Sequence, residues 1–236
     1  MRVSGFSLAL ALISYIPLAV PAMSQIGRSR GMRVSLTDLC VTEGTITALP
    51  AHRLLVTNPN VHATLNRETP QDIEADFVYL GPSGESDTAS SSQNHHQFGF
   101  ELFAQDACNL VYVMWRLEPE SNIGVFVKSN PQQHIHDECG RRGTITAEAE
   151  YKLPLPPVRA GEHVSHTLRA KIKGSRLLVF ADGALVWRCE LSPEILRTRG
   201  PVGIHCDNAK LEIMLTVAPP VANAPVIPCK PAAESD

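Results

Sequence analysis

Apolar residues between 72 and 217 recur with a period of two in several segments, and this pattern favours β-structure for most of the chain. In the segment DIEADFVYL, Ile73, Ala75 and Phe77 fall on one side and three acids fall on the other. Successive side chains of a strand point to opposite faces, so the pattern is typical of a strand with one buried face. The same alternation recurs in the segments 97–105, 109–117, 123–128, 166–174 and 209–217.

The stretch LLVFADGALVWRCEL, residues 177–191, predicts a hairpin. Its two apolar runs are joined by Asp182-Gly183, and a two-residue type I′ turn needs positive φ at both central positions, which Asp and Gly tolerate. The only predicted helix is a single turn that starts after Ser192, because Ser can cap a helix and Pro193 suits its first position.

This series of strands predicts the fold class. Many antiparallel strands separated by Gly, Pro and Ser loops favour an all-β, two-sheet antiparallel jelly-roll sandwich. Trp115 and Trp187 fall in phase with apolar neighbours, so both are expected in its core.

The ends of the chain differ from this central region. Residues 1–24 have one early arginine, a short apolar run and a small-residue exit, which predict a cleaved signal peptide. We expect residues 25–33 to be a flexible leader, 34–217 the β-sandwich domain, and 218–236 an extended Pro/Ala-rich tail. This organisation predicts a secreted or periplasmic protein with no transmembrane segment after signal cleavage.

The charge of the chain excludes one class of partner. Loss of Arg2 with the signal peptide changes the formal net charge from −3 to −4. A nucleic-acid-binding domain normally carries a basic patch or stripe. The mildly acidic composition therefore predicts no nucleic-acid partner.

Six cysteines predict a disulfide-bonded protein. An even number in an exported chain favours bridges, and no two of these cysteines have the C-x-x-C spacing of a metal site. Six cysteines allow 15 pairing schemes. Their order along the chain favours the pairs Cys40–Cys229, Cys108–Cys139 and Cys189–Cys206.

Two segments of the C-terminal half, HTLRAKIKGSRLLVFADGALVW and GPVGIHCDNAKLEI, carry a family resemblance. They resemble the concanavalin A-like lectin/glucanase superfamily, with its laminin-G-like and sugar-hydrolase-like domains. The resemblance covers residues 34–217 in strand order and implies a two-sheet jelly roll with one concave face. It does not imply one activity, because the superfamily includes lectins, hydrolases, lyases and adhesion modules.

Catalytic residues are not assigned from the sequence. Asp72, Glu74 and Asp76 share one strand face and could supply a glycosidase carboxylate pair. Their order departs from the E-x-D-x-x-E strand of the superfamily's glucanases, and a solvent-facing strand explains them equally well.

Metal ligands are not assigned either. The segment HIHDE (134–138), the pair His95-His96 and the pair Asp207-Asn208 have ligand chemistry. None of them fixes a complete ligand set at a typical spacing, so we expect no metal and no cofactor.

A binding surface is predicted on the strand 109–117. Its apolar phase faces the core, so Tyr112 and Arg116 face the opposite way, and Glu101 and Lys128 share their side from the flanking strands. Sugars suit such a face, because their C–H groups stack on aromatic rings and their hydroxyls bind charged groups. The candidate ligand-binding residues are therefore Glu101, Tyr112, Arg116 and Lys128.

Three functions agree with these features. The first hypothesis is a secreted lectin-like module that binds carbohydrate on the concave sheet face. The alternatives are a glycoside hydrolase or lyase of the same superfamily and a non-catalytic adhesion or envelope protein. An enzyme would need two carboxylates, or an acid with His or Tyr, in one groove. The glycan and the oligomeric state stay open.

Overall fold

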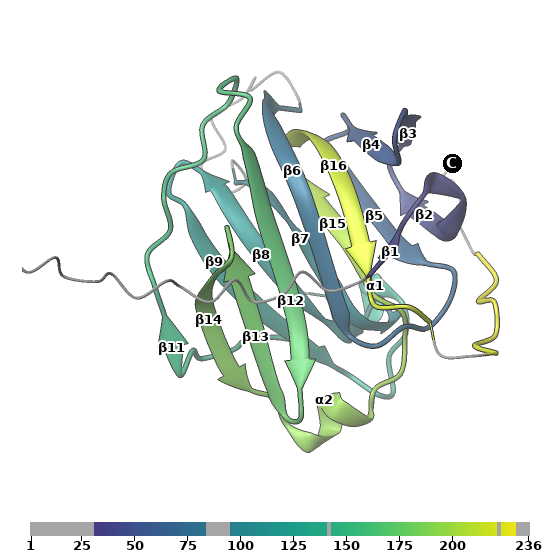
Figure 1. Cartoon of the computed structure of the whole chain (residues 1–236). Helices are drawn as coiled ribbons and strands as arrows, with labels where there is room; N and C mark the ends of the chain where they lie inside the picture. Colours follow the sequence, from purple (N-terminus) through teal and green to yellow (C-terminus); the bar gives the residue numbers. More distant parts are fainter. Residues whose placement is uncertain (1–30, 84–94, 141–142, 221–222, 230–236) are drawn as a thin grey trace, which may run out of the picture.

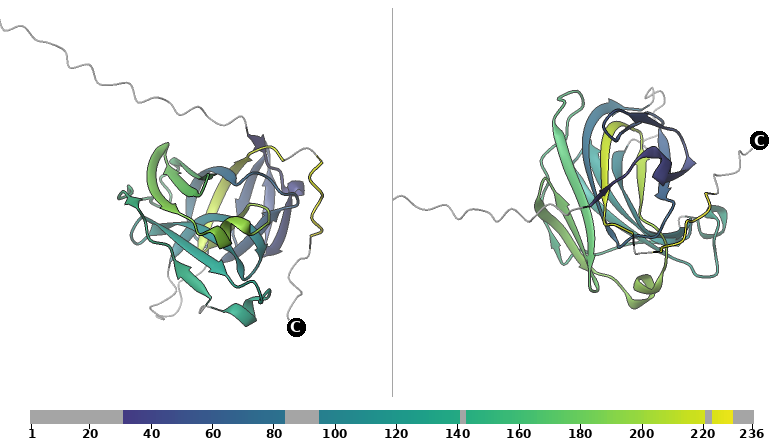
Figure 2. Two further views of the ribbon diagram at one scale, coloured as in Figure 1. Left: turned by 90° about the horizontal axis from the view of Figure 1, so that it is seen from below. Right: turned by 45° about the vertical axis from the view of Figure 1, so that its right-hand side comes forward.

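The structure is a computed structural model that describes residues 31–83, 95–140, 143–220 and 223–229. Two antiparallel sheets pack face to face (Figure 1, Figure 2), so the predicted all-β sandwich is confirmed. The predicted signal peptide, residues 1–24, lies outside the described residues. Within the described part of the chain, no helix has the length and apolar character needed to cross a membrane.

Sheet A contains the strands that cover the front of Figure 1. In spatial order they are β11 (Tyr151–Lys152), β14 (Ala184–Glu190), β13 (Arg176–Ala181), β12 (Ser165–Lys173), β6 (Asp72–Pro82), β16 (Ala209–Val217), β4 (Arg53–Val56) and β3 (Ile46–Leu49). A further strand, β1 (Met32–Arg33), pairs with the end of β16. It takes in two residues of the segment that we expect to be a flexible leader.

Sheet B lies behind sheet A in the same view. Its strands in spatial order are β10 (Thr144–Thr146), β9 (Asn122–Ser129), β8 (Asn109–Glu118), β7 (His96–Asp106), β15 (Gly203–Asp207), β5 (Asn60–Leu65) and β2 (Leu39–Glu43). The described helices are the short elements η1 (Leu36–Asp38), α1 (His136–Cys139) and α2 (Pro193–Arg197). The helix predicted after Ser192 is α2.

The predicted hairpin is formed by β13 and β14. Asp182 has φ of 48° and Gly183 has φ of 80°. Both central residues therefore take the left-handed conformation that the Asp-Gly pair was expected to supply.

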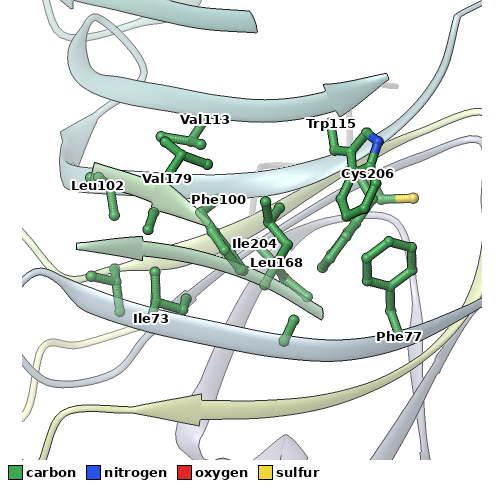
Figure 3. Packing of buried hydrophobic residues seen from close by; sticks show 14 of the residues in the cluster. Ile73, Phe77, Phe100, Leu102, Val113, Trp115, Leu168, Val179, Ile204 and Cys206 are labelled. Atoms are coloured by element: carbon green, nitrogen blue, oxygen red, sulfur yellow. The ribbon is translucent and has the colours of Figure 1, made fainter. Parts of the chain in front are cut away.

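The core lies between the two sheets, where side chains of β6, β12 and β13 meet those of β7, β8 and β15 (Figure 3). Phe77 of β6 packs against Phe98 and Trp115, with ring centroids 5.2 and 5.5 Å apart. Burying a side chain of this size contributes about 1.5–3 kcal/mol. Trp115 and Trp187 are both buried, as predicted.

Two of the three predicted disulfides are present. Cys40 of β2 is bonded to Cys229 of the C-terminal segment, and Cys108 in the β7–β8 turn is bonded to Cys139 of α1. The first bridge ties the tail to sheet B. Near it, the backbone N–H of Ile227 donates to the carbonyl oxygen of Asn66 at 2.7 Å.

The third predicted disulfide is wrong, because Cys189 and Cys206 are free thiols. Cys189 belongs to β14 in sheet A, whereas Cys206 belongs to β15 in sheet B. The two strands follow one another along the chain but are not neighbours in space. Both thiols are buried among the apolar side chains of the core.

Candidate functional site

A groove with a volume of about 1680 Å³ runs across the face of sheet B that is turned away from the core. Residues of β2, β5, β7, β8, β9 and β15 line it. The segment around His134, the loop at Gly200, and Ile227 and Pro228 of the C-terminal segment also contribute. The groove is therefore formed on a rigid sheet and bordered by loops.

The centre of the groove floor is formed by three adjacent strands, β5, β15 and β7. Alternation turns Ile204 and Cys206 into the core and leaves His205 on the groove side. His62 of β5 stands directly opposite His205, while Glu101 of β7 stands opposite Gly203. Neighbouring strand positions therefore bring two imidazoles and one carboxylate together.

Two glycines allow this close arrangement. Gly99 stands opposite His205 and Gly203 stands opposite Glu101. A Cβ atom at Gly99 would lie 2.0 Å from the carbonyl oxygen of Val113, and one at Gly203 would lie 2.6 Å from that of Ala63. Each large polar side chain therefore faces a position with no side chain on the neighbouring strand.

The three central side chains are in direct contact. His62 Nδ1 lies 2.6 Å from Glu101 Oε1, and His205 Nδ1 lies 3.7 Å from the same oxygen. The two imidazole rings meet edge to face with centroids 3.9 Å apart. Among the residues that the structure describes, these three form the group whose ligand atoms all lie within 4.8 Å of one another.

A second carboxylate faces the other nitrogen of each histidine. Asp207 Oδ2 lies 2.9 Å from His205 Nε2, and Glu43 Oε2 lies 3.7 Å from His62 Nε2. The contact with Asp207 is short, but it is an ion pair without a hydrogen bond. Both ring nitrogens of His205 are buried without a hydrogen-bond partner. The attraction there is electrostatic.

The charges in the groove perturb the ionisation of its groups. Burial would raise the pKa of Glu101, but the two neighbouring imidazoles of His205 and His62 together lower it. Burial would lower the pKa of His205, but Asp207 and Glu101 raise it to about 9. Burial, with Glu101 and other nearby carboxylates, raises the pKa of Tyr112. The groove therefore holds an ionised acid beside a neutral phenol.

Three of the four predicted ligand-binding residues line this groove: Glu101, Tyr112 and Lys128. The Tyr112 ring meets that of His205 edge to face at 5.1 Å. Lys128 Nζ lies 5.7 Å from the centroid of Tyr112 and donates to the carbonyl oxygen of Ala107. Arg116 lies further along β8 and is not among the residues that line the groove.

The carboxylates considered for catalysis lie on sheet A. Asp72 accepts two hydrogen bonds from Arg169, and Glu74 lies 3.7 Å from the same guanidinium group. Asp76 accepts a hydrogen bond from the hydroxyl of Thr167. These acids and Glu101 belong to different sheets, so they do not form a catalytic pair.

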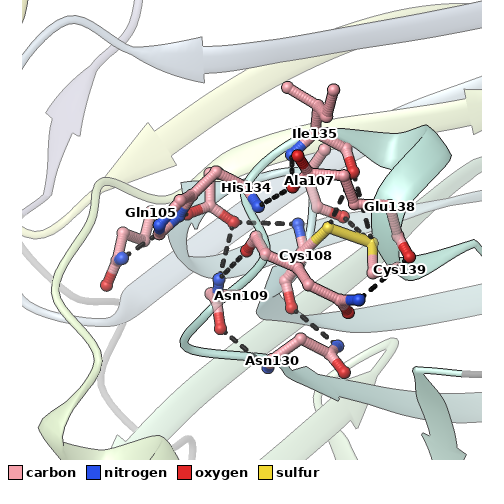
Figure 4. Close-up of polar contacts among 11 residues, drawn as sticks. Gln105, Ala107, Cys108, Asn109, Asn130, His134, Ile135, Glu138 and Cys139 are labelled. Atoms are coloured by element: carbon pink, nitrogen blue, oxygen red, sulfur yellow. Dashed lines mark hydrogen bonds and ion pairs between the residues drawn. A yellow bond between two sulfur atoms is a disulfide. The ribbon is translucent and has the colours of Figure 1, made fainter.

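His134 and Ile135 of the histidine-rich segment line the groove. Figure 4 shows the polar contacts around this segment. His134 Nδ1 lies 2.8 Å from Asp106 Oδ2, and Glu138 accepts a hydrogen bond from the backbone N–H of His134. Close by, the side chain of Asn130 donates to the carbonyl oxygen of Cys108. Together with the Cys108–Cys139 disulfide, these contacts fix the border of the groove.

Sequence reasoning did not identify three residues that line the groove: Glu43, His62 and His205. Asp207 was considered only with Asn208, as an oxygen pair for a metal, and not as part of the sheet B surface. The segment GIHCD contained a signal, since alternation places His205 and Asp207 on the face opposite Ile204 and Cys206. Only the strand order places them beside Glu101.

The sequence matches no protein-family model and no curated protein. Among solved structures, the carbohydrate-binding module CBM66 from Bacillus subtilis is similar, with a TM-score of 0.51 and 13% identity over 75% of this chain and 91% of that chain. The VIP36 exoplasmic/lumenal domain has a TM-score of 0.47 and 10% identity over 76% and 82% of the two chains. The likeness to CBM66 establishes the fold, which is the concanavalin A-like jelly roll implied by the sequence resemblance.

Proposed function

We propose that this chain is a secreted or periplasmic lectin-like protein that binds carbohydrate in the sheet B groove. The observation that carries the proposal is the composition of the groove floor, where the Tyr112 ring lies beside Glu101, His205 and Lys128. An aromatic ring with charged groups around it suits a sugar, which has an apolar face and hydroxyl groups at its edge.

The dimensions of the groove agree with this ligand. A volume of about 1680 Å³ exceeds the usual range for a pocket that encloses one small molecule, which is about 300–1,000 Å³. The space suits an oligosaccharide that lies across several strands. A carbohydrate-binding module has the same fold, and the two disulfides agree with an oxidising compartment outside the cytoplasm.

The test is a glycan array, followed by calorimetry on each glycan that is retained. We expect Tyr112→Ala to weaken binding about 10-fold through loss of ring contact, and Glu101→Gln to weaken it further. Arg116→Ala is the matched control, because Arg116 is on the same strand but does not line the groove. The proposal would be contradicted if the array detected no bound glycan, or if Tyr112→Ala and Arg116→Ala lowered the affinity equally.

A second candidate function is carbohydrate cleavage in the same groove. One observation favours it: Glu101 contacts His62 and His205 and lies near Tyr112, so an acid, two imidazoles and a phenol share one site. Such groups can exchange protons with a sugar. Incubation with polysaccharides would release new reducing ends or unsaturated sugars if the groove is catalytic, and neither if it only binds.

A further inference from the structure

We propose that His62, Glu101 and His205 form a zinc site on the floor of the groove. Two imidazole nitrogens and one carboxylate oxygen are a donor set that zinc uses when its fourth position is left open to water or a ligand. The proposal does not depend on carbohydrate binding, and its test uses the metal alone.

The positions of the three donors suit one ion. The ligand atoms all lie within 4.8 Å of one another, and Glu101 Oε1 is 2.6 and 3.7 Å from the two Nδ1 atoms. Tetrahedral zinc with bonds of 2.0–2.2 Å places its donors about 3.3 Å apart. Small rotations of the side chains would therefore admit the ion without movement of the strands.

The second carboxylates provide an independent observation. A histidine that binds a metal through one nitrogen commonly presents its other N–H to a carboxylate, which fixes the ring and raises its basicity. Here Asp207 stands 2.9 Å from His205 Nε2 and Glu43 stands 3.7 Å from His62 Nε2. Both Nδ1 atoms are thereby turned toward Glu101.

The unsatisfied nitrogens of His205 and the charges around the histidines also favour a bound cation. His205 Nδ1 is buried without a hydrogen-bond partner, and such a group normally has a partner in the folded protein. The carboxylates of Glu43, Glu101 and Asp207 surround the two histidines. A divalent ion that replaces the protons at the two Nδ1 atoms would neutralise these carboxylates in the same way. The nitrogen donors favour zinc over calcium, which prefers six to eight oxygens.

The site is tested by calorimetric titration of the chelator-treated, disulfide-bonded full chain with Zn²⁺, together with the visible absorption of the Co²⁺ form. We expect one ion per chain. His62→Gln and His205→Gln should each weaken Zn²⁺ binding at least about 100-fold, and Glu101→Gln should weaken it strongly. Asp207→Asn, which removes no direct ligand, should weaken it about 10- to 100-fold.

His134→Gln is the matched control, because this histidine also lines the groove and pairs with an acid, but is not one of the three proposed ligands. It should leave Zn²⁺ affinity unchanged. The proposal is overturned if the wild type takes up no Zn²⁺ at micromolar concentration, if the double variant His62→Gln/His205→Gln binds as well as the wild type, or if His134→Gln loses as much affinity. Circular dichroism would verify that each variant folds. If a histidine variant does not fold, the Zn²⁺ affinity of Asp207→Asn provides the test instead.

Discussion

The outer faces of the two sheets both carry acids and bases at alternate positions, but they arrange them differently. On sheet A, Asp72 accepts two hydrogen bonds from Arg169 and lies 3.2 Å from Lys171 Nζ. On sheet B, Glu101 and Asp207 both approach one histidine, His205, whose nitrogens make no hydrogen bond. In the first set, the acid is hydrogen-bonded to the cation that it faces. In the second set, His62 and Gln97 contact the acids, and the nitrogens of His205 stay without a hydrogen bond.

This difference distinguishes the sheet A face from the proposed binding surface on sheet B. On sheet A, permanent cations pair with Asp72 and Glu74. The acids around His62 and His205 outnumber the permanent cations near them, and their balance depends on bound protons or on a ligand. Groups left unsatisfied in a folded protein call for an explanation, and a ligand-binding site supplies one. Four experiments sharpen the comparison.

The largest effect on stability is expected on sheet A. Arg169→Ala should lower the free energy of unfolding by about 3 kcal/mol, because it leaves the mostly buried Asp72 with a single cation. Arg53→Ala is the control, since its pair with Glu212 is exposed and should contribute less than about 1 kcal/mol. Urea denaturation measures both. Equal losses would show that the sheet A pair is an ordinary surface contact.

The same ion pair predicts a pH dependence. Burial would raise the pKa of Asp72, but Arg169 and Lys171 together lower it below its ordinary value. The stabilisation is therefore complete above the ordinary value of about 4 and is lost as the pH falls through the lower folded-state pKa. Asp72→Asn should cost about 2 kcal/mol at neutral pH. Urea midpoints should show this difference shrinking in acid, and a constant difference would refute the charge-based explanation.

On sheet B, Gly99 of β7 lies beneath the groove and should not tolerate a side chain. Gly99→Ala would place its Cβ 2.0 Å from the carbonyl oxygen of Val113, so the backbone must move, at a cost of about 1–3 kcal/mol. Gly124→Ala is the matched control on β9, because its Cβ would meet only the ring of Phe126, at 3.0 Å. Thermal unfolding compares them. If Gly99→Ala is no less stable than the control, then β7 and β8 do not approach each other as closely at Gly99 as the structure shows.

The two faces also differ in how far the sequence could predict them. β7, β8 and β9 are consecutive antiparallel strands, so local alternation was enough to place Glu101, Tyr112 and Lys128 on one side. His62 and His205 come from β5 and β15, and the chain separates β5, β7 and β15 by long connections. Period-2 alternation gives the face of each residue but not the neighbour of each strand. The central histidines of the groove therefore required the structure.

The wrong disulfide has the same origin, and it leads to the smallest predicted effect. The bridges Cys40–Cys229 and Cys108–Cys139 lie on the sheet B side, and neither involves a strand of sheet A. A Cys189–Cys206 bridge would have joined the two sheets covalently. With both thiols free, packing of the core holds the described parts of the sheets together.

A thiol count tests this arrangement. Burial, with nearby acids, raises the pKa of Cys189 to about 11 and that of Cys206 to about 12, and the neutral thiol is not the reactive form. The native protein should therefore expose no reactive thiol at neutral pH, and denaturation without reductant should expose two. Cys189→Ala should reduce the count to one and cost only about 1 kcal/mol. Absence of thiols after denaturation would mean that the two cysteines are bonded, and β14 and β15 would then have to lie close enough to link the two sheets.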